Sequence, residues 1–356
     1  MEELSTTPIA LLSADKDNLN VTDSIEEIFQ FTNLTDTQIA AAEDGYRGQR
    51  ELMMNGTGYD DIDAVQAMNS DPLPARLFHG KDAHEMCRSR EGGCIAPFAR
   101  IRPLIVTAPN HKIMSCVVQK SMSSVMLATM CYLLRGEEFI KAGRSLLFDL
   151  GAFGFCQNKN NFPNVDSMLE TLRTTNPHDI RFTMITRDPV DRFLSGFVDR
   201  CIRVGDRCFG CRNNMTCFLD AEVSRAERYV RREITGSMIP RLTMEDMHIF
   251  PQNWRCDMQT YYRNYDFIRY SSDPSGTLLD DLSRILKEQN VSSSAISYIS
   301  QSLSTGRTSH STITTKSRVY LEQRLRSSPY LMEQIVRLFY HDYVLLHYPL
   351  PDLNSL

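Results

Sequence analysis

The segment from Met114 to Leu134 constrains the fold more than any other part of this 356-residue chain. Its pattern predicts an apolar strand to Val118, a short turn, and an apolar helix from Ser123. The turn holds one lysine and three serines, and it contains no glycine. Free N–H groups and the positive end of a helix dipole beside a lysine suit a phosphate. The missing glycines exclude the G-x-x-x-x-G-K-[ST] loop of nucleotide triphosphatases.

A second strand–turn–helix pattern follows about seventy residues later. Residues 182–186 predict a strand, Arg187 follows it directly, and Pro189 suits the first turn of a helix. Ser195 lies about two helical turns further along. Because ligands bind at the carboxyl ends of parallel strands, we expect Arg187 and Lys120 to face one crevice. For either motif alone, the simpler interpretation is an ordinary loop lysine or a carboxylate-paired arginine.

Alternating strand and helix patterns predict an α/β fold with a parallel sheet flanked by helices. The expected strands are residues 104–107, 112–118, 145–150, 182–186 and 266–270. The expected helices are residues 123–135, 165–175, 190–203, 219–234, 277–289 and 319–342. The Ser- and Thr-rich residues 292–311 predict a helix edge and a loop.

The charge is divided unevenly along the chain. Residues 1–86 hold 17 Asp or Glu and 5 Lys or Arg, whereas residues 87–356 hold 27 and 34. We therefore expect an acidic, weakly structured region over residues 1–95, with solvated helices at 24–31 and 36–53, and a basic folded domain over residues 96–356. A basic domain suits anionic ligands. Nucleic acid is not expected, because the sequence has no zinc-finger, homeodomain or RNA-binding signature.

Cysteine usage indicates the compartment. Ten cysteines are present, with Cys87 near Cys94 and a cluster at Cys201, Cys208, Cys211 and Cys217. The C-x-x-C spacing inside that cluster also fits zinc, but no second such pair follows, which favours disulfides. Five N-x-[ST] sequons occur, at Asn20, Asn33, Asn55, Asn214 and Asn290. Both features predict an oxidising secretory compartment.

The first ten residues, Met1 to Ala10, are acidic and polar, without a basic flank or an apolar core. No stretch of the sequence has the length and hydrophobicity of a membrane-spanning helix. We therefore expect membrane association only through an anchor that is not present in this sequence.

From about residue 100 to 345 the chain resembles the Golgi carbohydrate sulfotransferases, the group that contains the chondroitin 4-O-sulfotransferases, and it is most similar to their nematode-expanded branch. Four segments carry the resemblance: CVVQKSMSSV (116–125), TRDPVDRFLSGF (186–197), HIFPQNWRC (248–256) and GRTSHST (306–312). The common loop of that family has a proline where this chain has Gln119, and Met122 is bulky. The resemblance implies the sulfotransferase fold, with a P-loop-like parallel sheet.

The resemblance also implies the donor PAPS (3′-phosphoadenosine 5′-phosphosulfate), with no metal. The residues implied for its 5′-phosphosulfate are Lys120, Ser121, Ser123 and Ser124. Those implied for its 3′-phosphate are Arg187 and Ser195. The resemblance further implies that a lid over the nucleotide is formed by Arg307, Thr308, Ser309 and Lys316. The alternative is that these residues form a polar surface loop.

Sulfuryl transfer is analogous to phosphoryl transfer, with in-line attack and charge on the equatorial oxygens. Lys120 is expected to neutralise charge on the bridging oxygen. A base must take the proton of the acceptor hydroxyl, and histidine suits neutral pH. His248 is the first candidate, although a histidine that only orders its loop is equally compatible. His310 is the second candidate, and Glu137 and Glu138 are weaker ones.

These observations predict a PAPS-dependent carbohydrate sulfotransferase acting on a chondroitin-type glycosaminoglycan, as a disulfide-bonded glycoprotein of the Golgi lumen or membrane. One alternative is an inactive relative that only binds a glycan or nucleotide, against which Lys120 and Arg187 argue. The other is a kinase-like phosphoryl transferase, against which the missing glycine-rich loop argues.

Overall fold

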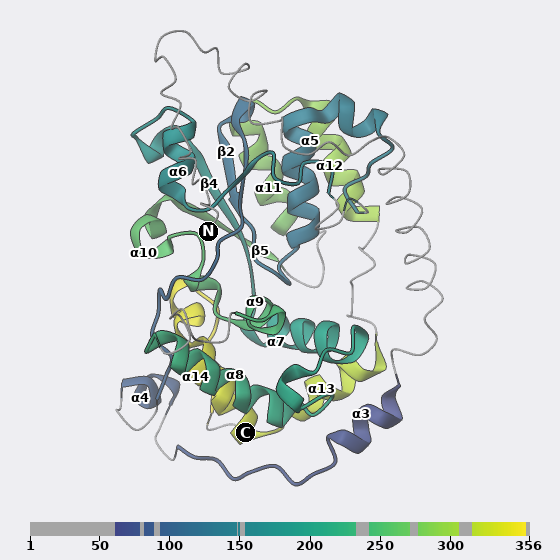
Figure 1. Cartoon of the computed structure of the whole chain (residues 1–356), viewed down its shortest axis with the longest axis vertical. Coiled ribbons are helices and arrows are strands. Elements are labelled where there is room, and N and C mark those ends of the chain that lie inside the picture. Colours follow the sequence, from purple (N-terminus) through teal and green to yellow (C-terminus); the bar gives the residue numbers. More distant parts are fainter. Residues whose placement is uncertain are drawn as a thin grey trace, which may run out of the picture. The chain divides into compact units, whose positions relative to one another are not determined.

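The fold is built on a five-stranded sheet with the order β3-β1-β2-β4-β5 (Figure 1). The computed structural model describes residues 61–78, 82–88, 93–147, 149, 154–232, 242–270, 277–305 and 315–353. The strands are β1 (Ile105–Ala108), β2 (Ile113–Cys116), β3 (Asn161–Phe162), β4 (Arg181–Arg187) and β5 (Tyr265–Tyr270). The predicted helices at 24–31 and 36–53 lie outside the described residues.

The expected α/β fold is confirmed, and the strand directions refine it. Strands β2, β4 and β5 are parallel, so their carboxyl ends meet at one edge of the sheet. Strand β1 runs antiparallel to both β2 and β3. Only residues 109–112 separate β1 from β2, and a connection this short cannot make the crossover that parallel neighbours require.

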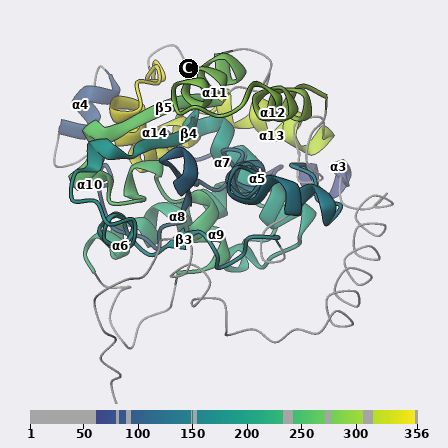
Figure 2. The ribbon, with the colours of Figure 1, turned by 90° about the horizontal axis from the view of Figure 1, so that it is seen from above.

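Helices cover both faces of the sheet (Figure 2). Helices α5 (Ser123–Lys141), α11 (Thr277–Glu288) and α12 (Ser293–Thr305) share one apolar cluster with residues of β1, β2, β4 and β5. Helix α6 (Val165–Thr171) and the short α10 (Met258–Tyr261) pack on the other face. Because both faces are covered, β1, β2 and β4 are almost entirely buried.

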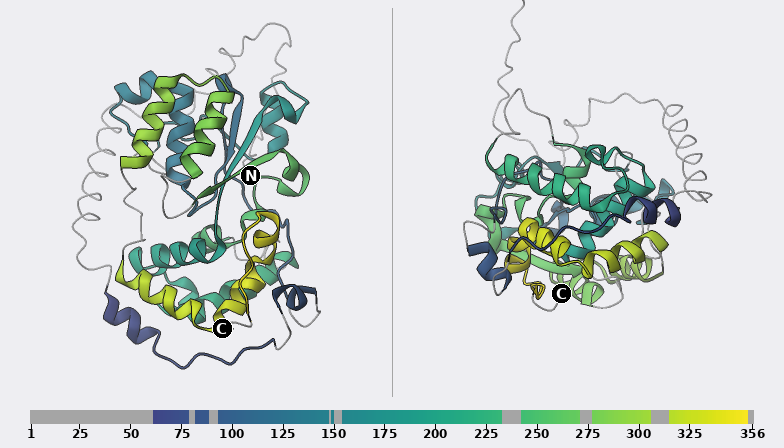
Figure 3. Two further views of the ribbon diagram at one scale, coloured as in Figure 1. Left: turned by 180° about the vertical axis from the view of Figure 1, so that it is seen from behind. Right: turned by 90° about the horizontal axis from the view of Figure 1, so that it is seen from below.

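A second layer of helices lies beyond the carboxyl ends of the parallel strands (Figures 1 and 3). It contains α7 (Pro189–Phe197), α8 (Met215–Val230), α9 (Met244–Ile249), α13 (Lys316–Arg326) and α14 (Pro329–Leu345). The helices of this layer share an apolar cluster of their own. Two helices before residue 95, α3 (Ile62–Met68) and α4 (Ala83–Arg88), bury Val65 and Met86 in this second cluster. The functional edge of the sheet is therefore enclosed between two hydrophobic cores.

Three predicted elements differ from the observed ones. The helix expected over 319–342 is divided at Ser328, whose side chain accepts the N–H of Leu331 and caps α14. The strand expected at 145–150 is not formed in its described part, where Leu146 and Leu147 lie in a turn after α5. The Ser-rich segment after residue 292 forms all of α12, because Ile299 and Leu303 are buried four residues apart.

Candidate functional site

The loop between β2 and α5 turns sharply without glycine. Lys120 has a φ of 67° and Met122 a φ of 58°, so both adopt the left-handed conformation that is costly for such residues. Helix α5 begins at Ser123, and no side chain in the described part of the chain caps it. The N–H groups of its first turn and its dipole therefore face the loop that carries Lys120.

Lys120 is a buried ion-pair partner and not an exposed loop lysine. Its Nζ lies 2.9 Å from Oδ2 of Asp199, and the two side chains are 8% and 5% exposed. Arg203 contacts the other oxygen of the same carboxylate, with Nε donating to Oδ1 at 2.7 Å. Burial lowers the pKa of Lys120, and the Asp199 carboxylate opposes this shift. Burial raises the pKa of Asp199, but the two cations outweigh burial and hold it well below its usual range.

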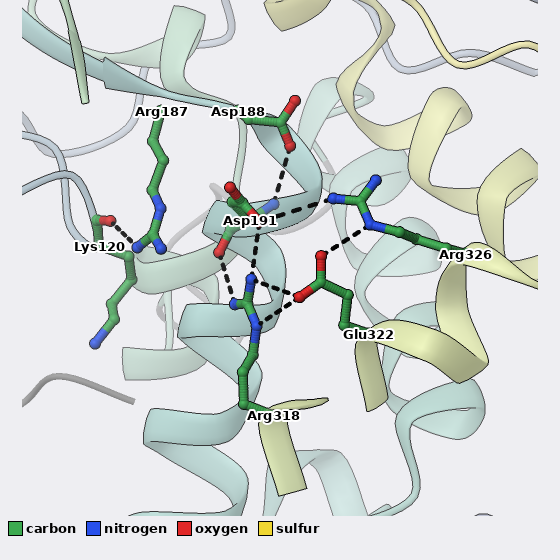
Figure 4. Close-up of polar contacts among 7 residues, drawn as sticks. All are labelled: Lys120, Arg187, Asp188, Asp191, Arg318, Glu322 and Arg326. Atoms are coloured by element: carbon green, nitrogen blue, oxygen red, sulfur yellow. Dashed lines mark hydrogen bonds and ion pairs between the residues drawn. The ribbon is translucent and has the colours of Figure 1, made fainter. Parts of the chain in front are cut away.

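Arg187, at the carboxyl end of β4, is brought against Lys120 (Figure 4). Its Nη1 donates to the Lys120 carbonyl at 2.9 Å, and its guanidinium lies 5.0 Å from the centre of the Tyr270 ring. Its Nε is buried and has no hydrogen-bond partner among the described residues. Burial lowers the pKa of Arg187. A buried guanidinium with an unfilled donor is expensive unless an anion reaches it.

Gln252 connects the two loops. This fully buried side chain accepts the N–H of Arg187 at 3.0 Å and the hydroxyl of Ser121 at 3.3 Å through the same oxygen. Its Nε2 donates to the Arg187 carbonyl at 2.8 Å. The Asp342 carboxylate in turn accepts the Gln252 N–H at 2.8 Å. This one carboxamide thus bridges the two loops, in addition to the direct bond from Arg187 to the Lys120 carbonyl.

Arg192 and a disulfide also hold the β2–α5 loop in place. The fully buried Arg192 donates to the carbonyl of Gln119 at 3.1 Å and to three consecutive carbonyls, those of His248, Ile249 and Phe250. Cys116, the last residue of β2, is bonded to Cys256, which ends the segment that contains Gln252. The two contacts join the end of β2 and the loop after it to residues 248–256, which form the end of α9 and the segment that follows it.

His248 lies near the end of α9 and has a defined tautomer. Its Nδ1 is 2.6 Å from the Met244 carbonyl, which can only accept, so Nδ1 carries the proton and Nε2 keeps a lone pair. Burial lowers the pKa of His248 to about 4, with Lys120 and Asp199 close enough to act on it in opposite directions. The imidazole is therefore neutral near pH 7.

Gly196 lets α7 approach α9 closely, since a Cβ there would lie 2.5 Å from Ile249.

The other predicted site residues occupy different positions. Ser123 and Ser124 open α5 and are half-buried. Ser195 is buried on α7. Arg307, Thr308, Ser309 and His310 lie outside the described residues, and Lys316 opens α13. Glu137 and Glu138 are at the far end of α5 from Lys120.

A comparison of the sequence with models of known protein families identifies the family of this chain. The model of the sulfotransferase family matches residues 103–349, which include both loops and the Gln252 segment. The chain belongs to the sulfotransferase family. In this sulfotransferase the matched region begins just before β1 and ends after α14, so it spans the sheet and the second helical layer.

Three proteins of Caenorhabditis elegans are similar to this sulfotransferase. Uncharacterized protein C18B2.2 is 39% identical over 299 residues, which cover 83% of this chain and 82% of that protein. Vep-2, named as a sulfotransferase on a provisional basis, is 38% identical over 73% of this chain and 80% of its own. Carbohydrate sulfotransferase chst-1 is 29% identical over 73% of this chain and 80% of its own. No solved structure matches the chain.

The cysteines of this sulfotransferase are paired. The disulfides are Cys87–Cys94, Cys116–Cys256, Cys131–Cys156, Cys201–Cys208 and Cys211–Cys217. The C-x-x-C pair is thus divided between two disulfides, and the described residues contain no cluster of His, Cys, Asp or Glu with metal-binding geometry. None of the helices that the structure describes combines the length and hydrophobicity needed to span a bilayer.

Several residues of the site escaped the sequence analysis. Asp199 and Arg203 follow Ser195 at intervals of four, so a helical wheel would have placed all three on one face. An ion-pair network also holds α13 to the first turn of α7, where Arg318 contacts Asp191 at 2.8 Å (Figure 4). It includes Glu322 and Arg326. No sequence signal reveals that contact, because 127 residues separate its partners.

An open hollow of about 510 Å³ lies at the opposite, amino end of the parallel strands. It is lined by Phe98, His178 and five residues of the connection that leads into β5: Gln259, Thr260, Tyr262, Arg263 and Asn264. None of the predicted site residues lines it. The charged groups described above therefore belong to a separate site at the carboxyl edge.

Proposed function

We propose that this sulfotransferase moves the sulfuryl group of PAPS to a hydroxyl of a glycan. The observation that carries the proposal is the meeting of two buried cations, Lys120 and Arg187, from two different loops at the carboxyl edge of the sheet. A donor with phosphates at both ends of its ribose matches two such cationic loops. The similarity to chst-1, a carbohydrate sulfotransferase, supports a carbohydrate acceptor.

In this proposal the β2–α5 loop binds the 5′-phosphosulfate through Lys120, the hydroxyls of Ser123 and Ser124, and the N–H groups that open α5. Ser121 acts chiefly through Gln252, because its buried hydroxyl already donates to that side chain. This loop would also take up the negative charge that develops on the bridging oxygen.

At the other end of the nucleotide, Arg187 and Ser195 bind the 3′-phosphate. Arg187 has an unfilled Nε donor, and Ser195 is buried on α7, the helix that begins two residues after Arg187. Charge-assisted hydrogen bonds from a guanidinium to phosphate are among the strongest in proteins. The 3′-phosphate would thus supply the counter-charge that buried Arg187 lacks.

His248 is the proposed base. The acceptor oxygen attacks sulfur, the bond from sulfur to the bridging oxygen breaks, and the electron pair leaves with the nucleotide. Nε2 of His248 takes the proton of the acceptor hydroxyl. The imidazole is neutral, and because Nδ1 carries its proton and donates it to the Met244 carbonyl, Nε2 has a lone pair available. Proton transfer and sulfuryl transfer then balance in a single displacement.

A chondroitin-type glycosaminoglycan in the Golgi lumen is the proposed acceptor and setting. The 34 basic against 27 acidic residues after position 86 suit a polyanionic chain, and the five disulfides suit an oxidising compartment. The proposed acidic stem consists of the residues before α3, and the boundary lies earlier than residue 95 because Val65 and Met86 pack in the apolar cluster of α8 and α14.

The test is ligand-dependent thermal stabilisation by PAP, the spent donor, compared with AMP and ATP. A ligand that binds only the native state raises its melting temperature, and PAP should do so at the lowest concentration. Lys120→Ala should keep the fold and lower sulfuryl transfer by about 10²–10³-fold. Lys141→Ala, at the exposed far end of α5, is the matched control and should retain activity. Equal stabilisation by PAP and AMP would refute the proposed donor.

A further inference from the structure

Asp199 has a separate cation on each of its carboxylate oxygens. Lys120 contacts Oδ2 at 2.9 Å, and Arg203 donates from Nε to Oδ1 at 2.7 Å. All three side chains are at most 10% exposed. Asp199 and Arg203 both belong to the π-helical segment Val198–Arg203, which continues α7 directly after Phe197. Such single-turn π segments are frequent at functional sites.

We propose that Asp199 is a positioning residue that holds the Lys120 ammonium away from the donor pocket until a 5′-phosphate draws it off. The inference rests on the proposed function, because it assigns the 5′-phosphate to the Lys120 loop. In the free protein the ammonium is engaged by Asp199, and nucleotide binding must break that contact. Asp199 therefore reduces the affinity for any ligand that requires Lys120.

The second cation makes this exchange feasible. When Lys120 leaves, Asp199 remains paired with Arg203, so no buried carboxylate is left without a partner. The flexible four-carbon stem of a lysine can move, whereas the planar guanidinium of Arg203 keeps its contact with Asp199. The carboxylate also counters the effect of burial on the Lys120 pKa and so keeps the ammonium charged before the nucleotide arrives.

The neighbouring charges agree with this role. Arg187 from β4 and Arg203 from the π segment both act on Lys120 as like charges, and His248 from α9 lies within the reach of its field. Without Asp199 the pocket would hold uncompensated positive charge in its empty state. A carboxylate at this place therefore stabilises the empty site and weakens its hold on the product.

The experiment measures the affinity of Asp199→Asn for PAP and for adenosine 3′-phosphate, which lacks the 5′-phosphate. Asparagine keeps the size of the side chain but removes the charge that holds Lys120. PAP should bind about tenfold more tightly, the effect of one charge-assisted contact no longer broken on binding. The affinity for adenosine 3′-phosphate should be unchanged, and the melting temperature of the free protein should fall.

Asp206→Asn is the matched control, since Asp206, just after the π segment, pairs with Arg200 of that segment at 2.7 Å. It should leave the affinity for both nucleotides unchanged. Arg203→Gln is a second variant, and it should change the affinity for PAP in the opposite direction because it leaves Lys120 as the main partner of Asp199. This change should weaken PAP binding several-fold and leave adenosine 3′-phosphate unaffected.

The outcomes separate this inference from the proposed function. If the unaltered protein binds PAP but Asp199→Asn binds it equally or more weakly, the role of Asp199 is wrong and the proposed donor stands. A parallel gain for adenosine 3′-phosphate, or an Arg203→Gln variant that binds PAP as tightly as the unaltered protein, overturns the inference as well. If the unaltered protein binds neither nucleotide, the proposed function fails and the inference fails with it.

Discussion

Replacing Gln252 by leucine tests whether one carboxamide holds the two loops together. Leucine preserves most of the volume but removes all three hydrogen bonds that the carboxamide makes. The N–H and carbonyl of Arg187 and the hydroxyl of Ser121 are buried, so each loses its partner without gaining water. An unsatisfied buried polar group costs roughly 1–3 kcal/mol. We expect the free energy of unfolding to fall by about 3–5 kcal/mol, after about 1 kcal/mol is regained from the apolar side chain.

Denaturant-induced unfolding with the disulfides kept oxidised measures this loss of stability. Calorimetric titration measures the affinity for PAP, which should fall if the two loops are no longer held at the right spacing. Gln259→Leu is the matched control, because Gln259 is exposed on α10 and its replacement should change stability by less than about 0.5 kcal/mol. Gln252→Glu should lose less stability than the leucine variant, since it keeps an acceptor for the Arg187 N–H, but it should bind PAP more weakly because it adds a negative charge beside Arg187. A leucine variant with the stability and PAP affinity of the unaltered protein would refute the bridging role.

Three further results are expected. Arg187→Ala should weaken PAP binding about 10²-fold more than AMP binding, and equal losses would remove Arg187 from the 3′-phosphate site. Because the folded-state pKa of His248 is lowered to about 4, the unfolded chain binds the proton more readily, so stability should fall by up to about 3 kcal/mol as pH drops from 6.5 to 4. His248→Gln should flatten that part of the stability profile, and an unchanged profile would contradict the buried, neutral imidazole. Replacing Cys116 and Cys256 together by serine opens a loop of 140 residues and should cost about 5 kcal/mol of unfolding free energy, whereas a loss below about 1 kcal/mol would show that the bond constrains little.

The parts of the site that the sequence predicts are those encoded locally. Lys120 is identified because a strand, a turn and a helix follow one another within about twenty residues, and Arg187 because proline marks the helix start after it. The adjacency of the two follows from strand order, since β2 and β4 are neighbours and parallel. Their separate positions were therefore predictable, and their contact followed once the sheet was assumed to be parallel.

The residues that join these loops are not encoded locally. Gln252 contacts Arg187 across 65 positions, and Arg192 contacts Gln119 across 73. Hydrophobic periodicity reports which face of an element is buried, but it does not report which polar side chain satisfies which carbonyl of another element. The burial of Lys120 escaped prediction for the same reason, because its partner Asp199 lies on a helix whose π turn has no sequence signature.

Arg192 directs all of its described hydrogen bonds to main-chain carbonyls and none to a side chain. Peptide oxygens are the same whatever residue carries them, so mutations at the contacted positions leave the anchor in place. A library randomised at Gln119 should therefore yield many folded variants, whereas one randomised at Arg192 should yield very few.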